Sequence, residues 1–204
     1  MNDSNPTPDT RAALIDAARG IFAEQGYDGA SVRAITSRAG ANLGAVTYHF
    51  GSKEALYHEV VASMMHPIRD RILEVARGEG APLERLDAVV ATYFEHFERY
   101  PDLPHFLIER IASGQLPPPP VLQTMTDVLR TVSGIVSEGQ ADGSIRAGNP
   151  VFMTLSLISQ PVYLTLVQHP LRAVTNARFS RGALVDHARA FVRAGLSSTV
   201  ESTP

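Results

Sequence analysis

The apolar positions of this chain recur mostly with the period of a helix. Between Thr10 and Gln25 they follow the spacing i, i+3, i+4, i+7 and i+8, which predicts an amphipathic helix. Gly26 can end that helix, because glycine readily adopts a left-handed C-cap. A second repeat predicts a helix of about two turns that Ser31 begins as N-cap and Gly40 ends. The apolar residues of the first repeat are Leu14, Ala17, Ala18, Ile21 and Phe22.

A third short helix is predicted from Leu43 to Phe50, with Asn42 as its N-cap. Gly51 should break it, and Ser52 can cap a fourth helix. We expect this fourth helix to kink or end at Pro67, because proline lacks the N–H that the helical hydrogen bond requires.

The rest of the chain continues the helical pattern. Residues 117–120 are four prolines, for which we expect a rigid, extended entry to the next helix. Asn149 and Ser180 can cap the two closing helices, the first of them with Pro150 at its first position. No segment alternates convincingly as a strand, so the predicted fold class is all-α. The predicted helices cover residues 86–97, 103–111, 121–140, 150–168 and 180–196.

One long segment, residues 147–171, contains no Asp, Glu, Lys or Arg. A membrane span is one interpretation of such a segment. Polar residues such as Gln160 and Gln168 lower its apolarity, however, and Pro150 and Pro170 bound it. We therefore favour a helix that is buried on nearly all sides, because it packs against both its own domain and a partner chain.

Composition narrows the class of protein. The chain has 204 residues, 44% of them apolar and 19% charged, as in globular domains with a buried core. The absence of cysteine excludes disulfides and thiolate metal cages, and neither end resembles a secretion signal, so we expect a cytoplasmic protein. The net charge of −3 argues mildly against a nucleic-acid partner. Residues 31–53 nevertheless hold three basic residues and no acidic one.

The two short helices joined by Gly-Ala-Asn, after a longer packing helix, have the spacing of a helix-turn-helix. Ordinary helical bundles can contain the same arrangement. Val46 and Phe50 lie four residues apart, so both can face inward. Gly44 and Ala45 are small, so the backbone there can enter a major groove. The residues left on the outer side are Ala45, Thr47, Tyr48 and His49.

Lys53 is the single lysine of the chain, beside seventeen arginines. It lies at a predicted helix N-terminus, where an ammonium group would repel the positive end of the helix dipole. Free N–H groups at the same place favour an anion. The position is therefore better explained with a phosphate nearby, which Tyr48, His49 and Lys53 can reach together.

Residues 10–60 resemble the TetR family of bacterial transcriptional regulators. The motifs that carry this resemblance are FAEQGYDGASVRAITSRAG, ANLGAVTYHF and GSKEALY. The resemblance implies a DNA-binding domain at 1–57, linked by the helix 53–66, and an effector-binding and dimerisation domain at 58–204. It also implies a ligand-responsive regulator, most often a repressor, that binds a pseudo-palindromic operator as a homodimer.

By the same resemblance, the DNA contacts fall on the second and third helices. Ser31 would contact a phosphate, and Arg33 a base or a phosphate. Tyr48, His49 and Lys53 would hold the backbone of the duplex. Leu43 and Ala45 stand where the family often has hydrogen-bonding residues, so we expect apolar contacts there, although Leu43 could equally fold into the core. The expected DNA-binding residues are Ser31, Arg33, Asn42, Leu43, Gly44, Ala45, Thr47, Tyr48, His49 and Lys53.

The resemblance further implies a cavity for a largely apolar small molecule in the C-terminal part, and a dimer interface formed by the helices near 150–168 and 180–196. Aromatic residues with a few polar anchors are typical of such cavities, although each aromatic could also be ordinary core. The candidate ligand-binding residues are Tyr93, Phe94, Phe97, His105, Phe106, Met125, Gln160 and Tyr163.

Other functions fit less well. The seven histidines lack the spacing of a zinc site, so we expect no metal, and no motif suggests a cofactor or a catalytic centre. The proline run could bind a polyproline-recognising domain, but a stiff loop is a simpler explanation. The alternatives kept are a regulator without a small-molecule effector, and a helical enzyme or interaction protein. The effector, the operator, and repression versus activation are open at this point.

Overall fold

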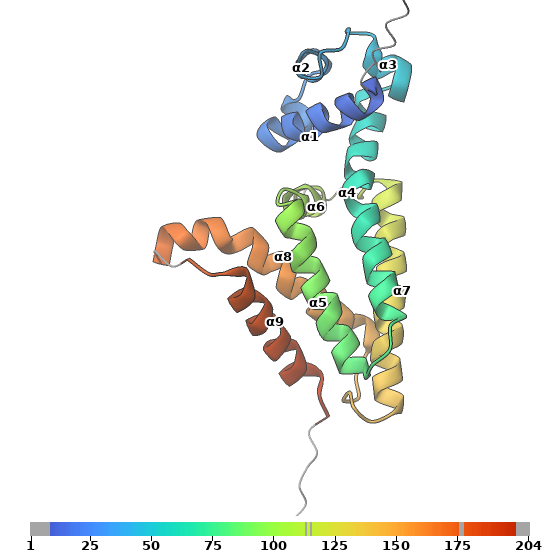
Figure 1. The fold of residues 1–204 in the computed structure, drawn as a ribbon, viewed down its shortest axis with the longest axis vertical. Helices are drawn as coiled ribbons and strands as arrows, with labels where there is room; N and C mark the ends of the chain where they lie inside the picture. The colour runs from blue at the N-terminus through green and yellow to red at the C-terminus, as the bar shows by residue number, and fades with distance from the viewer. Residues whose placement is uncertain (1–8, 113, 115, 176–177, 199–204) are drawn as a thin grey trace, which may run out of the picture. The chain divides into compact units, whose positions relative to one another are not determined.

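The computed structural model describes residues 9–112, 114, 116–175 and 178–198, and within them the chain is all-α, as predicted (Figure 1). The described residues contain no strand, only an isolated β-bridge between Ile145 and Ser197. In chain order the helices are α1 (Thr10–Gly29), α2 (Val32–Arg38), α3 (Ala45–Phe50), α4 (Lys53–Ala76), α5 (Pro82–Arg99), α6 (Leu103–Ala112), α7 (Pro119–Ala141), α8 (Pro150–Thr175) and α9 (Arg181–Leu196).

The chain divides into two compact units. The first comprises the residues up to Met64 together with Pro118–Pro120, and it holds α1, α2, α3 and the first half of α4. The second comprises Met65–Pro117 and the residues from Val121 onward. Each unit has its own buried apolar residues, and each is described separately below.

The first unit is built around α1, whose five predicted apolar residues are all buried. Gly26 has a φ of 68°, as the left-handed conformation expected for it requires, but helical residues continue beyond it to Gly29. Ser31 begins α2 as predicted, because its Oγ accepts a hydrogen bond from the N–H of Ala34 at 3.1 Å. The rings of Phe22 and Tyr57 meet edge to face, with centroids 5.1 Å apart.

Helix α3 begins later than predicted. Its N-cap is Gly44, with no side-chain hydrogen bond, so the prediction of Asn42 as the cap is wrong. Asn42 instead uses its main-chain carbonyl, which accepts from the N–H of Ala45 at 3.0 Å and holds the turn. Ser52 does cap α4, since its Oγ accepts from the N–H of Ala55 at 3.0 Å.

Helix α4 continues through Pro67 to Ala76, so of the two expected outcomes at this proline, a kink or an end, the end does not occur. Proline removes the hydrogen bond to the carbonyl four residues earlier, that of Ser63. Ser63 and Pro67 are both exposed, so water can satisfy the freed carbonyl. The proline run is likewise not extended throughout, because Pro119 and Pro120 already form the first turn of α7. Proline is accommodated there because the first turn of a helix needs no N–H donor.

In the second unit, α5 packs against α8 and α9. Ion pairs at the edges of this packing join Arg193 to Asp87 and Arg181 to Glu98. The core side of α5 is mostly apolar, and its largest buried members are Tyr93, Phe94 and Phe97. These contacts hold the two closing helices to the body of the unit.

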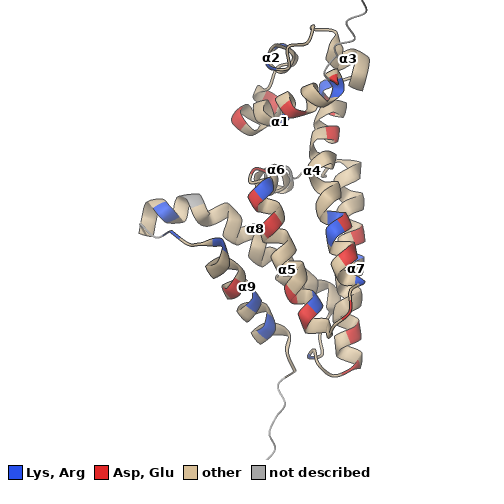
Figure 2. Cartoon of the chain, in the orientation of Figure 1, with Lys and Arg blue, Asp and Glu red and all other residues tan. Residues whose placement is uncertain are grey.

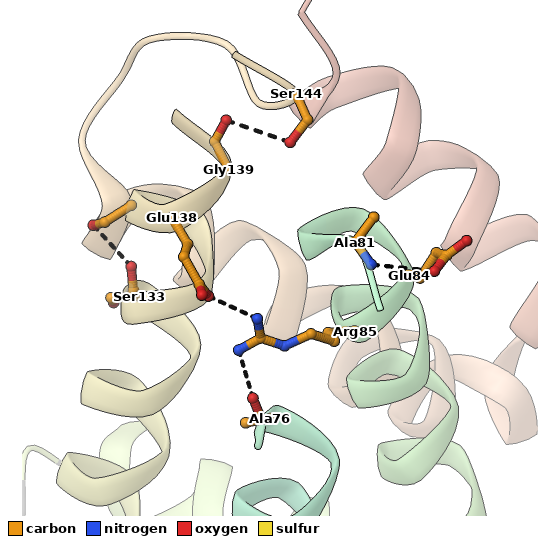
Figure 3. Close-up of polar contacts among 9 residues, drawn as sticks. Ala76, Ala81, Glu84, Arg85, Ser133, Glu138, Gly139 and Ser144 are labelled. Atoms are coloured by element: carbon orange, nitrogen blue, oxygen red, sulfur yellow. Dashed lines mark hydrogen bonds and ion pairs between the residues drawn. The ribbon is translucent and has the colours of Figure 1, made fainter. Parts of the chain in front are cut away.

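Arg85 on α5 ties two further elements together (Figure 3). Its guanidinium donates to Glu138 on α7 at 2.7 Å and to the main-chain carbonyl of Ala76, the last residue of α4. Its side chain is only 16% exposed. This largely buried guanidinium satisfies a helix C-terminus as well as a carboxylate.

Replacing Arg85 with Met should lower the free energy of unfolding by about 1–3 kcal/mol, because it leaves the Ala76 carbonyl without its donor. The midpoint of urea denaturation would measure this change. Arg71→Met is the matched control, since the Arg71 pair with Glu74 is exposed and should hardly affect the midpoint. Equal midpoints for both variants would contradict the role given to Arg85.

Helix α8 starts as predicted, with the Asn149 carboxamide oxygen accepting from the N–H of Val151 at 2.9 Å. Among the described helices it alone, from Pro150 to Gln168, has the length and apolarity to cross a membrane, a test that core helices of soluble proteins also pass. Figure 2 shows that charged residues are nearly absent from it. Only 22% of this segment is buried, so the expected burial on nearly all sides is not reached within one chain.

Candidate nucleic-acid interface

The outer face of α3 and the turn before it carry exposed side chains. Tyr48 is 84% exposed and Leu43 is 62% exposed, and Thr47 lies exposed between them in sequence. The structure therefore decides the two possibilities left open for Leu43, which points to solvent and not into the core. Tyr48 and His49 form an edge-to-face ring pair with centroids 4.9 Å apart.

Ala45 lies on the opposite side from the one expected. It is 7% exposed and buried together with Val46, so the expectation that it faces outward is wrong. Adjacent helical residues differ by about 100° in direction, and a core-facing stripe can be that wide. Phe50 is only half-buried. The side chains available to a groove are therefore those of Leu43, Thr47 and Tyr48, beside the exposed backbone of Gly44.

Helix α2 presents Arg33 at its first turn. This side chain is exposed and makes no ion pair with any residue in the part of the chain that the structure describes. Ser31 is exposed as well, although its hydroxyl is already used as the N-cap. Asn42 is exposed beyond the end of α2.

Arg38 is not available in the same way. Both of its terminal nitrogens donate to the carboxylate of Glu24 on α1, each at 2.8 Å. This guanidinium hydrogen bond lowers the pKa of Glu24 below its usual value, so the carboxylate stays ionised. The positive charge counted over residues 31–53 is thus partly neutralised by a residue outside that window.

Lys53 has structural partners that the sequence does not suggest. Its ammonium group donates to the main-chain carbonyls of Tyr27 and Ala30, both at 2.9 Å. It also lies over the Tyr27 ring, 4.4 Å from the centroid. These carbonyls follow the break at Gly26, so the lysine binds the negative end of α1. A phosphate contact by Lys53 stays a prediction.

The candidate ligand-binding residues divide among different surroundings in the second unit. Three of them, Tyr93, Phe97 and Met125, line a cavity of about 370 Å³. Phe94 and His105, together with Phe97, line a separate hollow of about 590 Å³. Phe106, Gln160 and Tyr163 are not among the described lining residues of either.

Most of the lining of the smaller cavity consists of aliphatic residues that sequence reasoning did not select. The spacing of these residues identifies them as the buried side of a helix. The sequence does not show which buried residues pack tightly and which border a cavity. Among the described residues that line it are Met65, Ile68, Leu103, Ile108, Leu122, Thr124, Leu129, Leu155 and Val162.

Comparison with known proteins tests the family suggested by the motifs. Residues 14–60 match the family model described as bacterial regulatory proteins, tetR family. The chain carries the DNA-binding domain of the TetR family. The match covers most of α1, all of α2 and α3, and the start of α4. It therefore includes Arg33 on α2, Leu43 in the turn before α3, and Tyr48 on α3.

Relatives of this TetR-family domain are named as transcriptional repressors. The repressor AcnR of Corynebacterium efficiens is 37% identical over 83 residues, which are 38% of this chain and 44% of AcnR. The chain thus aligns with less than half the length of that relative. The repressor KstR2 of Mycolicibacterium smegmatis is 27% identical over 158 residues, 76% of this chain and 77% of KstR2.

A solved structure supports the fold of the whole chain. The ketosteroid transcriptional regulator KstR2 of Mycobacterium tuberculosis superposes with a TM-score of 0.74 and 20% sequence identity. The superposition covers 94% of this chain and 97% of that one. The predicted arrangement, a helix-turn-helix domain followed by a larger helical domain, is confirmed, while the individual DNA contacts stay predictions.

Proposed function

We propose that this protein is a cytoplasmic, ligand-responsive transcriptional repressor that binds a pseudo-palindromic operator as a homodimer and is released by a small molecule. Residues 1–57 would bind the duplex, and residues 58–204 would bind the effector and form the dimer. The protein would act by binding alone, without catalysis. The observation that carries this proposal is the exposure of Leu43, Thr47 and Tyr48 on α3 and the turn before it, within a TetR-family domain.

The proposed DNA contacts divide by chemistry. Arg33 is an exposed guanidinium without an ion-pair partner in the described chain, so it is free to bind a base edge or a phosphate. Leu43 and the Thr47 methyl group suit the methyl group of thymine. Tyr48 and His49 would hold the flanking phosphates, with Ser31, Asn42, Gly44 and Lys53 as the other contacts, whereas the buried Ala45 supports the helix from behind.

Dimerisation is supported by the surface of α8 and α9. Phe152, Leu155 and Tyr163 recur at i, i+3 and i+11, which places them on one face of α8. They are 67%, 49% and 65% exposed in the single chain, and Phe191 on α9 is 57% exposed. Large apolar side chains gathered in this way mark an interface. A second copy of the chain would cover them and match the two halves of the operator.

Release by an effector is supported by the cavity of about 370 Å³. Met65 and Ile68, on the later part of α4, line this cavity, and Lys53 lies at the start of the same helix. The protein could exist in two conformers that differ in the position of α4. An effector that binds one of them more tightly would shift the population toward that conformer. Operator affinity then falls by the difference in binding free energy between the two conformers.

Binding to DNA can be tested by fluorescence anisotropy with the promoter region beside the gene, over a series of salt concentrations. We expect specific binding whose affinity falls steeply with salt, with a slope of log K against log salt of about −0.9 for each phosphate neutralised. A duplex of scrambled sequence is the control and should bind more weakly. An absence of DNA retention even at low salt would favour a helical enzyme or interaction protein instead.

The role of an effector needs a separate measurement. Operator affinity should fall when a small molecule that binds the cavity is added, and it should recover when that molecule is removed. Unchanged operator affinity in the presence of a molecule shown to bind would leave a transcriptional regulator that works without an effector.

A further inference from the structure

The turn before α3 presents an apolar side chain that the fold does not bury. Leu43 is 62% exposed there, and Tyr48 on α3 is 84% exposed. Among the described residues of the first unit, these two are the exposed large apolar side chains, since the others are buried or half-buried. An exposed apolar side chain gains free energy when a partner removes it from water. The apolar surface that this unit offers to a partner is therefore concentrated at α3 and the turn before it.

Leu43 and Thr47 lie on one side of this element. They are four residues apart, the spacing at which side chains share a face of a helix. Gly44 between them has φ −75° and ψ −12°, so the backbone is already helical in the turn. Asn42 and Tyr48 instead line a hollow of about 410 Å³ together with residues of α1, and neither Leu43 nor Thr47 is among its described lining residues. The exposed amide of Asn42 therefore faces a different side from Leu43.

The chemistry of the side chains limits what this face can distinguish in a major groove. Residues 43–50 contain no Asn, Gln, Asp, Glu, Lys or Arg, which are the side chains that commonly pair with the hydrogen-bonding edge of a base. Leucine has neither a donor nor an acceptor. The apolar group that a base presents in the major groove is the methyl group at C5 of thymine. In 5-methylcytosine the same group stands at the same ring position.

We infer that Leu43 recognises the methyl group at C5 of a pyrimidine, and not the hydrogen-bonding edge of the base, so that 5-methylcytosine can replace thymine in the operator. This inference rests on the proposed function, because it specifies which DNA the same interface prefers. The contact buries the methyl group against Leu43, and it is the same whether the pyrimidine pairs with adenine or with guanine. Methylation of a cytosine at this position therefore increases operator affinity.

Duplexes that differ at one base pair separate the two kinds of recognition. Footprinting of the promoter region beside the gene locates the half-site. Each of its pyrimidines is then made thymine, uracil, cytosine or 5-methylcytosine in turn, with the matching purine opposite. At the position that faces Leu43, thymine and 5-methylcytosine should bind equally within about twofold, and uracil and cytosine about three- to fivefold more weakly, the effect of burying one methyl group. Fluorescence anisotropy measures these affinities.

The substitution Leu43→Ala tests whether this side chain makes the contact. Leu43 is exposed, so the melting temperature should stay unchanged, while the preference for methylated bases should fall to within about twofold because most of the apolar surface is lost. Arg33→Met is the matched control, because Arg33 is also exposed but lies on α2. This control should weaken binding and keep the ratio between methylated and unmethylated duplexes.

The possible outcomes separate the inference from the proposed function. If affinity follows the base pair at every position, with uracil equal to thymine and 5-methylcytosine equal to cytosine, the inference is wrong and the DNA-binding regulator stands. A preference for the methyl group that Leu43→Ala leaves unchanged would overturn the role of Leu43. If no promoter duplex binds more tightly than a scrambled one, the proposed function fails as well, and this outcome is seen before any base is replaced.

Discussion

The substitution Phe152→Asp is expected to convert the protein to monomers and to weaken its affinity for a two-half-site operator by about 10²- to 10⁴-fold, because the second half-site is then no longer bound at a high effective concentration. Phe152 is 67% exposed on the face of α8 that also carries Leu155 and Tyr163. A carboxylate within an apolar interface would be desolvated without a partner. Sedimentation velocity measures the oligomeric state, and fluorescence anisotropy measures the operator affinity.

The same helix offers a control for this substitution. Val174 is 83% exposed near the C-terminal end of α8, outside the segment assigned to the interface. Val174→Asp should leave both the oligomeric state and the operator affinity unchanged. If Phe152→Asp stays dimeric, the interface does not lie on this face of α8, whatever happens to the affinity for DNA.

The parts of the fold that the sequence predicted well are local. Ser31, Ser52 and Asn149 cap their helices as expected, since a cap involves a side chain and an N–H only two or three residues away. Asn42 is the exception, because its main-chain carbonyl holds the turn and the helix begins at Ala45. The choice between these two arrangements depends on how α3 packs, which the local sequence does not specify.

The parts of the candidate site that the sequence did not predict depend on distant residues. Lys53 finds the carbonyl of Tyr27 across 26 positions of the chain, and Arg38 finds Glu24 across 14. The sequence does not decide whether Ala45 faces a DNA groove or the core. Its methyl side chain is too small to mark the buried face of a helix clearly. These placements follow from tertiary packing, and a charge count over a sequence window cannot include them.

The cavity presents a similar difficulty. The sequence predicts a mainly aromatic lining, yet Phe94 and Phe106 are not among the described residues that line this cavity. Aliphatic residues such as Ile68 and Leu122 form much of its wall. Helical periodicity identifies the buried side of a helix but not the space between helices.

Lys53→Met should affect the stability of the first unit and not only its charge. The substitution keeps most of the apolar stem of the side chain but leaves the carbonyls of Tyr27 and Ala30 without their donor. The free energy of unfolding should fall by roughly 1.5–3 kcal/mol, the range for hydrogen bonds that involve a charged group. Affinity should fall for all DNA sequences alike, because the end of α1 is no longer held against α4. Thermal denaturation and anisotropy with two unrelated duplexes measure these effects.

Arg33→Met is the matched control for Lys53→Met, since it removes one positive charge from the same unit at an exposed position without an ion pair in the described chain. Arg33→Met should leave the melting temperature unchanged and alter the preference among DNA sequences. The dependence on salt separates the two roles of Lys53. If Lys53 only positions the domain, its replacement leaves the salt slope unchanged, whereas the loss of a phosphate contact reduces that slope by about one. An unchanged melting temperature together with a reduced slope would show that the ammonium acts on phosphate and that its bonds to the end of α1 contribute little to stability.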